Sequence, residues 1–196
     1  IKPLRQMEFL ILSDNKKYQE QIKDFIDGYH KLGKDDKLML DLTLMNREED
    51  DIKTRKEILK RNGLTQAYAK VEKVLQEIYK KKGQFGLNSY GDLPDYFPRR
   101  VKDVRALMQT IKDDPTYNVI QAELDRLGED VSMADKEKAV QAMINTGRFP
   151  SLALLEPSSS KRRTIRRVSS EWKHHYDNSA DALINHIYES NEAIYA

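Results

Sequence analysis

Apolar side chains return at helical spacing along most of the chain. One set consists of Tyr18, Ile22, Phe25, Ile26 and Tyr29, which share one face of a helix. The same spacing recurs later, with inner residues Ala67, Val71, Val74, Leu75 and Ile78; Val104, Leu107, Met108 and Ile111; Ile120, Leu124 and Leu127; Ala139, Val140, Met143 and Ile144; and Leu183, Ile184, Ile187, Tyr188 and Ile194. Glycines at positions 33, 63, 83, 128 and 147 each fall just past such a segment, where helices commonly end. The pattern predicts an all-α fold of seven to nine helices, arranged as a bundle or as an elongated array.

Residues that favour helix starts precede several of these segments. Thr65 is a candidate N-cap, and Asp114-Pro115 has the form of an N-cap followed by a proline in the first turn. Ser132 and Asp135 resemble a capping box, and Asn178 or Ser179 is expected to open the last helix.

The leucines at 38, 40, 42 and 44 are ambiguous, because they alternate as in a strand. However, Leu38, Leu42 and Met45 also share one face of a helix. No other segment has a strand pattern, so a strand here would lack a partner. We therefore predict a helix.

Two irregular stretches, 84–100 and about 149–169, interrupt the helical pattern. They divide the chain into an N-terminal helical hairpin region (1–83), a loop with middle helices (84–147) and a basic linker with a C-terminal helix pair (148–196). The three regions are also compatible with a single domain. The chain starts at Ile1 and stops within a helical pattern, so we expect a fragment of a longer protein.

The composition excludes several classes of function. The net charge is only +2, so no global field draws the chain to nucleic acid or membrane. The absence of cysteine excludes disulfides, thiolate zinc sites and thiol catalysis. No apolar run approaches the roughly 18 residues of a membrane span, and no signal peptide is recognisable.

The segment Tyr96-Phe97-Pro98-Arg99-Arg100 is the most distinctive motif. Its structural interpretation is a loop clamped onto helices by one of the two aromatic rings, with an arginine at helix-terminal carbonyls. Its functional interpretation is an arginine pair offered to a phosphate or carboxylate. We favour the structural interpretation.

A basic stretch provides the second candidate site, formed by Lys161, Arg162, Arg163, Arg166, Arg167 and Trp172. Clustered cations beside an aromatic ring are typical of nucleic-acid binding. The competing interpretation is a solvated or ion-paired face, because acidic residues follow closely. Arg166-Arg167-Val168-Ser169 also matches a basophilic kinase site, which is a short and common pattern.

The segment from Ile58 to Tyr68 places Gly63 between two helices, as in a helix-turn-helix. The second helix mixes charges of both signs, whereas a helix in a DNA groove would be mostly basic. We therefore expect an ordinary αα-hairpin.

The remaining residues predict no catalytic site, no metal site and no cofactor. His174 and His175 are adjacent and diverge on a helix, and His186 has no acidic ligand in register. His30 lies near a helix end, where the dipole favours a cation. The acidic run 48–51 suits a helix start and lacks the spacing of a calcium loop.

The order Tyr96 to Asp103, after a helix ending Tyr79-Lys80, resembles a recurrent segment of very large polyvalent bacteriophage proteins. Lys161 to Ile165, Tyr176-Asp177 and Ala182-Leu183 continue the resemblance, which covers about residues 40–196. It implies a helical connecting region of a protein packaged in the virion and ejected with the genome, and it carries over no catalytic residue. It also implies that Arg99, Arg100, Arg162 and Arg163 organise the fold.

Three functional hypotheses result. The first is a non-catalytic structural module that contacts proteins or other parts of the same polypeptide, in the virion and then in the host cytoplasm. The second is a nucleic-acid-binding module that uses the 161–172 stretch. The third is a fragment of an enzyme whose active site lies elsewhere. Outside a phage context, a cytoplasmic location is expected.

Overall fold

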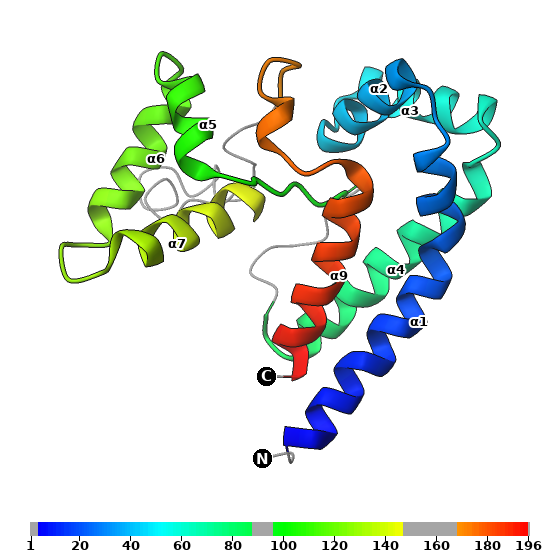
Figure 1. The fold of residues 1–196 in the computed structure, drawn as a ribbon, viewed down its shortest axis with the longest axis horizontal. Helices are drawn as coiled ribbons and strands as arrows, with labels where there is room; N and C mark the ends of the chain where they lie inside the picture. The colour runs from blue at the N-terminus through cyan, green and yellow to red at the C-terminus, as the bar shows by residue number, and fades with distance from the viewer. Residues whose placement is uncertain (1–3, 88–95, 147–167, 196) are drawn as a thin grey trace. The chain divides into compact units, whose positions relative to one another are not determined.

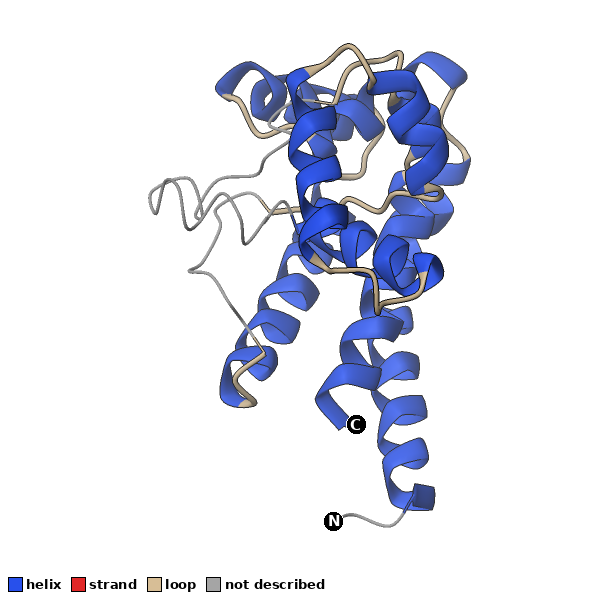
Figure 2. Cartoon of the chain, turned by 90° about the vertical axis from the view of Figure 1, so that its left-hand side faces the viewer, coloured by secondary structure: helices blue, strands red, loops and turns tan. Residues whose placement is uncertain are grey.

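The computed structural model describes residues 4–87, 96–146 and 168–195. Within these ranges the chain forms eight α-helices, one 3-10 helix and no strand (Figures 1 and 2). The all-α prediction and its range of seven to nine helices are confirmed. The helices are α1 (Leu4–His30), α2 (Lys34–Met45), α3 (Glu49–Arg61), α4 (Thr65–Gln84), α5 (Val104–Ile111), α6 (Pro115–Arg126), α7 (Met133–Thr146) and α9 (Ser179–Tyr195), with the 3-10 helix η2 (Lys173–His175).

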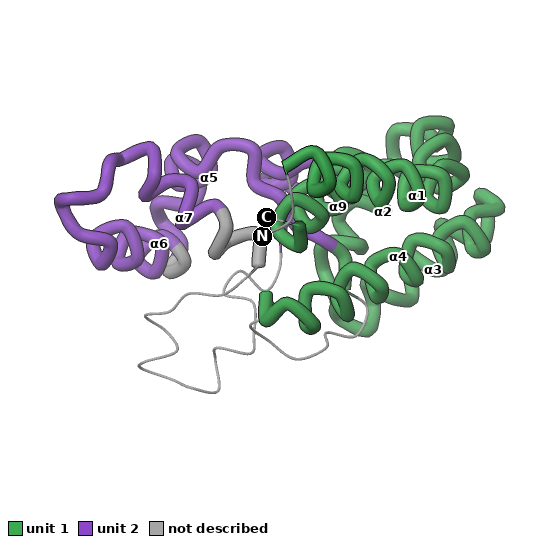
Figure 3. Tube along the Cα trace, turned by 90° about the horizontal axis from the view of Figure 1, so that it is seen from below, with its two compact units in different colours: residues 1–97, 178–196 green, residues 98–177 purple. Residues whose placement is uncertain are grey.

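The chain divides into two compact units, which Figure 3 colours separately. Unit 1 comprises Ile1–Phe97 and Asn178–Ala196, and unit 2 comprises Pro98–Asp177. These bounds differ from the division at 83 and 147 that the two irregular stretches suggest. The physical reason is that the C-terminal helix α9 packs on α1 and α4, which lie far from it in the sequence.

The core of unit 1 lies where α1, α4 and α9 pack side by side (Figures 1 and 2). The spacing of the apolar residues explains this arrangement, because each helix turns a single stripe inward. The buried side chains of that core include Tyr18, Ile22, Phe25 and Tyr29 of α1, Val71, Val74 and Ile78 of α4, and Leu183 and Ile187 of α9. Phe97 joins the same cluster from the loop after α4 and is 1% exposed.

Helices α2 and α3 pack against each other in the same unit. The segment at 38–45 is helical, as predicted, and its buried face is not the one that Leu38, Leu42 and Met45 share. Leu40 and Leu44 are fully buried with Asp41 between them, whereas Leu38 is 36% exposed. Leu42 is half-buried, and only Met45 of those three residues is buried. The helix is turned this way because Asp41 has buried polar partners, which are described below.

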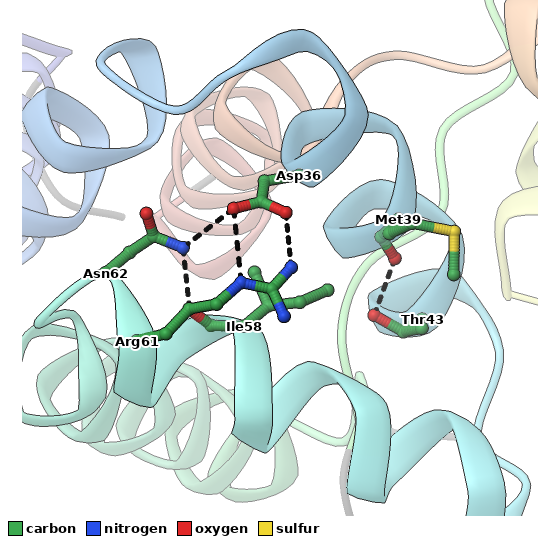
Figure 4. A network of polar contacts seen from close by, with 6 residues as sticks. All are labelled: Asp36, Met39, Thr43, Ile58, Arg61 and Asn62. Carbon is green, nitrogen blue, oxygen red and sulfur yellow. Dashed lines mark hydrogen bonds and ion pairs between the residues drawn. The ribbon is translucent and has the colours of Figure 1, made fainter.

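A polar cluster at the surface joins the first turn of α2 to the end of α3 (Figure 4). Asp36 accepts hydrogen bonds from the guanidinium of Arg61 and from Nδ2 of Asn62, the latter at 3.0 Å. The hydrogen bonds from Arg61 and Asn62 lower the pKa of Asp36. These three residues link α2 to α3 at the surface. Because exposed ion pairs contribute little to stability, the link sets the register of the two helices more than it strengthens the fold.

Helix ends follow the glycine rule at two positions and depart from it at another. Gly63 ends α3 with φ +67°, and its neighbour Leu64 donates its N–H to Leu59 O at 2.8 Å, which completes a Schellman motif. Helix α4 continues through Gly83, and Gly86 (φ +68°) ends it instead, with Leu87 N bonded to Lys82 O at 2.8 Å. Gly128 also has positive φ after α6, and Gly147 lies outside the described residues.

Helix starts agree more closely with expectation. Asn178 caps α9 by accepting the Asp181 N–H at 2.9 Å, and Ser132 caps α7 by accepting the Asp135 N–H at 3.2 Å. Helix α6 begins at Pro115. The acidic run forms a capping box at the start of α3. Only Thr65 is displaced, since it is the first residue of α4 and Leu64 is the N-cap.

Unit 2 consists of α5, α6, α7 and η2, and its two chain ends pair with each other. Val101 and Tyr176 form an antiparallel bridge, with Lys102 N bonded to His175 O and Asp177 N bonded to Arg100 O, both at 2.8 Å. The Arg100 guanidinium also contacts Asp177 at 3.2 Å. The buried apolar residues of this unit include Val101, Val104, Leu107, Ile111, Ile120, Val140, Val168 and Tyr176.

Replacement of Phe97 by alanine tests the contribution of the loop to unit 1. Because the ring is 1% exposed in the main core, Phe97→Ala is expected to lower the free energy of unfolding by about 3–5 kcal/mol. Urea denaturation followed by circular dichroism measures this loss. Tyr96→Ala is the matched control and is expected to cost less, since Tyr96 is only half-buried. Unchanged stability of both variants would contradict the clamp.

Candidate functional site

The distinctive loop distributes its residues between the two units. In unit 1, the half-buried Tyr96 ring stands edge-on to His186 of α9 at a centroid distance of 6.0 Å, and Phe97 is in the core. In unit 2, Pro98 and Arg99 are buried and Arg100 is paired with Asp177. Arg99 is 2% exposed, so its guanidinium is not presented to solvent. The two arginines therefore do not form an open anion-binding pair.

Only Trp172 of the basic stretch falls within the residues that the structure describes. Lys161, Arg162, Arg163, Arg166 and Arg167 lie outside the described residues. Trp172 is half-buried, and its backbone joins the turn that leads into η2 through a 3.1 Å bond to Ser169 O. Nucleic-acid binding by this stretch stays a prediction.

A buried carboxylate joins three helices of unit 1. Asp41 of α2 is 1% exposed. It accepts hydrogen bonds from the Tyr29 hydroxyl of α1 at 2.9 and 3.0 Å. It also accepts the backbone N–H of Ser179 at 3.0 Å and the Ser179 hydroxyl at 2.6 Å. Since Ser179 is the first residue of α9, the carboxylate also lies at the positive end of that helix.

The chemistry of this cluster is structural. Burial raises the pKa of Tyr29, and the charge and hydrogen bond of Asp41 raise it further, so the phenol stays protonated and continues to donate. Tyr29 and Ser179 are each 3% exposed. A substrate cannot reach the hydroxyl of Ser179 without opening the helix contacts. The arrangement of serine, carboxylate and tyrosine therefore braces the fold.

A second polar cluster lies further along the same three helices. Asp14 of α1 accepts hydrogen bonds from Lys81 of α4 at 3.0 Å and from Tyr195 of α9 at 2.6 Å. Burial alone would raise the pKa of Asp14, but the hydrogen bonds from Tyr195 and Lys81 outweigh it and lower the pKa. Next to it, Asn191 donates to Asn15 at 2.7 Å. This cluster orients α9 against α1 and α4.

The histidines form contacts but no ligand group. His174 and His175 have ring centroids 3.9 Å apart, and His175 Nε2 lies 2.6 Å from the Thr110 hydroxyl of α5. Burial lowers the pKa of His175, and the neighbouring His174 adds to the effect, while Asp103 opposes it. Among the residues that the structure describes, no three histidine or acidic side chains converge as metal ligands.

Unit 2 contains a half-open hollow of about 340 Å³ between α5, α6 and α7. Its apolar lining is formed by Val104, Met108, Leu124 and Met133. Its carboxylate, Glu137, is held by Arg105 of the facing helix. The hollow thus offers shape and apolar surface, and its only acid is already engaged with a cation.

The first turns of α1 carry the most exposed large apolar residues of the described chain. Leu4 is 69% exposed, Phe9 70% and Leu12 68%. In Figures 1 and 2 this end of α1 runs on beyond the ends of α4 and α9. Grouped apolar side chains on an ordered helix are a common feature of protein interaction surfaces.

Sequence reasoning missed Asp41, Asp14 and this apolar end. Asp41 is preceded and followed by leucine, and a lone acid in an apolar run signals a buried polar contact. The run Phe9-Leu10-Ile11-Leu12 exceeds the single stripe that a surface helix needs. Both signals were present in the sequence, although neither names the partner.

The fold and surfaces define an all-α protein of two helical units. No protein-family model matches the chain, and comparisons with curated proteins and with solved structures also find no match. In the part of the chain that the structure describes, no helix is long and apolar enough to cross a bilayer.

Substitution of Asp41 tests whether the buried carboxylate braces unit 1. Asp41→Ala leaves the buried Tyr29 and Ser179 donors without this acceptor, so we expect a loss of about 3 kcal/mol in the free energy of unfolding. Urea titration measures it. Asp35→Ala, an exposed acid in the first turn of the same helix, is the control and should change stability by less than about 0.5 kcal/mol. Equal effects of the two variants would refute the bracing role.

The lowered pKa of His175 predicts a pH dependence of stability. The unfolded side chain titrates near 6.5, and the folded one at a lower pH, so the unfolded state binds more protons in between. Stability from this group is therefore complete above pH 6.5 and is lost as the pH falls below it. Urea unfolding of the wild type at pH 7.5 and 5.5 should show this fall, and His175→Gln should reduce it. His30→Gln, at an exposed position, is the control, and an undiminished fall in His175→Gln would contradict the assignment.

Proposed function

We propose that this chain is a non-catalytic helical module that acts through protein–protein contacts. The observation that supports the proposal is the exposure of Leu4, Phe9 and Leu12 on one end of α1. An apolar side chain held in water on a regular helix gains free energy when a partner covers it.

The placement of the polar residues supports the same proposal. Asp41, Asp14 and Glu123 each receive hydrogen bonds from neighbouring side chains, with Arg126 bonded to Glu123 at 2.9 Å. Groups of this kind would have to face a cleft in order to catalyse a reaction. Here Asp41 and Asp14 hold helices together, and Glu123 is paired with Arg126 within α6, so binding is the activity that the available surfaces favour.

We further propose that the module belongs to a large phage protein of the kind that the segment from Tyr96 to Asp103 resembles. Such a protein is packaged in the virion and reaches the host cytoplasm on ejection. A covered α1 end suits this setting, because a connecting region contacts neighbouring subunits or other parts of its own polypeptide.

Packaging of altered protein tests the proposal. In phage particles that carry the parent protein, Phe9→Ser with Leu12→Ser is expected to lower incorporation about tenfold or more, because contact side chains in an interface dominate its affinity. Quantitative mass spectrometry of purified particles measures the amount. The control Met39→Ser alters a residue that is 42% exposed on α2 and should be packaged normally. The far-UV circular dichroism spectrum of the isolated chain should be unchanged in both variants, which shows that each still folds.

Two results would contradict the proposal. One is absence of the wild-type protein from purified particles. The other is normal packaging of the double serine variant.

A further inference from the structure

The outward side of α1 carries an apolar patch formed by Phe9 and Leu12. Phe9 precedes the buried Tyr18 by nine residues, which is two and a half helical turns. The Phe9 side chain therefore points away from the core of unit 1, in agreement with its 70% exposure. Leu12 lies one turn further along and is 68% exposed.

The patch is local. Beyond it, the same side of α1 is occupied by charged residues, which are exposed at every position: Lys16, Glu20, Lys23 and Asp27. A solvated helix face normally has this character throughout. The patch therefore requires an explanation other than the general composition of the helix.

The charges around the patch have a self-complementary order. Glu8 stands four residues before Leu12 and Lys16 stands four residues after it, and both are exposed. Arg5 stands seven residues before Leu12, and Glu20 stands eight after it. When two copies of α1 run antiparallel with a two-fold axis at Leu12, Glu8 of each copy faces Lys16 of the other. Arg5 then lies beside Glu20 of the other copy.

Other pairings fit this order less well. A parallel pair would place Arg5 on Arg5 and Lys16 on Lys16, which repel each other. A partner of a single charge sign would match one half of the sequence around the patch and oppose the other half. A two-fold antiparallel contact satisfies both halves, because the same patch serves on each side of an isologous interface.

We propose that the partner of the α1 patch is a second copy of this chain, bound antiparallel through Phe9 and Leu12 with the two-fold axis at Leu12. This inference rests on the proposed function and names its partner. The apolar residues exclude water at the centre of the contact, and the four charged residues set direction and register.

Cysteine cross-linking tests the register, and the chain is suited to it because it contains no cysteine. With Leu12→Cys, the two thiols of a dimer lie opposite each other at the two-fold axis, so mild oxidation is expected to give a disulfide-linked dimer. A mixture of Glu8→Cys chains and Lys16→Cys chains is expected to give the mixed dimer in preference to either homodimer. Lys53→Cys, exposed on α3, is the control and should remain monomeric.

Sedimentation equilibrium tests the charge order without cross-links. The wild type is expected at twice its 22.9 kDa chain mass. Glu8→Lys alone and Lys16→Glu alone should each weaken self-association at least about tenfold, since each places like charges opposite each other. The exchange of both charges in one chain should restore it, and the control Lys53→Glu should have no effect.

A wild type that stays monomeric at about 100 µM would overturn the inference, because even a small specific interface is populated there. So would a dimer that is unaffected by both single charge reversals, or one that cross-links at Lys53→Cys but not at Leu12→Cys. These results are separable from those of the packaging experiment. A monomeric chain whose Phe9→Ser/Leu12→Ser variant is lost from particles would retain the proposed function and reject only the second copy as partner.

Discussion

The buried carboxylate of Asp41 is the constraint on which the arrangement of unit 1 depends. A charge without water must have hydrogen-bond donors, and those around Asp41 come from α1 and from the first residue of α9. This requirement fixes the rotation of α2, since Leu40 and Leu44 face the core only when Asp41 does so. It also fixes where the last helix must start, although more than a hundred residues separate Ser179 from Asp41 in the chain.

Polar and apolar groups therefore have different roles in unit 1. Asp41 and Asp14 join helices, so they specify which helices meet and in which orientation. The apolar stripes supply most of the free energy but would tolerate other rotations. The apolar residues at the start of α1 stand outside this arrangement, because Phe9 and Leu12 extend beyond the contacts that the core requires. They are therefore the part of the described surface that is best suited to recognition.

Much of the secondary structure could be predicted from the sequence, because periodicity and caps are local. The sequence correctly predicted the buried face from Tyr18 to Tyr29, the cap at Asn178 and the helix end at Gly63. Long-range partners were not predicted. The leucine spacing does not define the buried face of α2, because it cannot reveal that Asp41 has donors on α1 and α9. Gly83 was wrongly predicted to lie just past the end of its helix. Helix α4 continues to Gln84, and Gly86 ends it instead.

The paired ends of unit 2 have a consequence for the history of the chain. Because the backbone groups that flank Val101 and Tyr176 are hydrogen-bonded to each other, the chain enters and leaves unit 2 at neighbouring points. A unit whose two ends lie side by side can be replaced, enlarged or removed without altering the rest of the chain, as long as the two segments that enter and leave it stay paired. We therefore expect differences in sequence and length among related chains to concentrate in unit 2, while the helices of unit 1 keep their lengths.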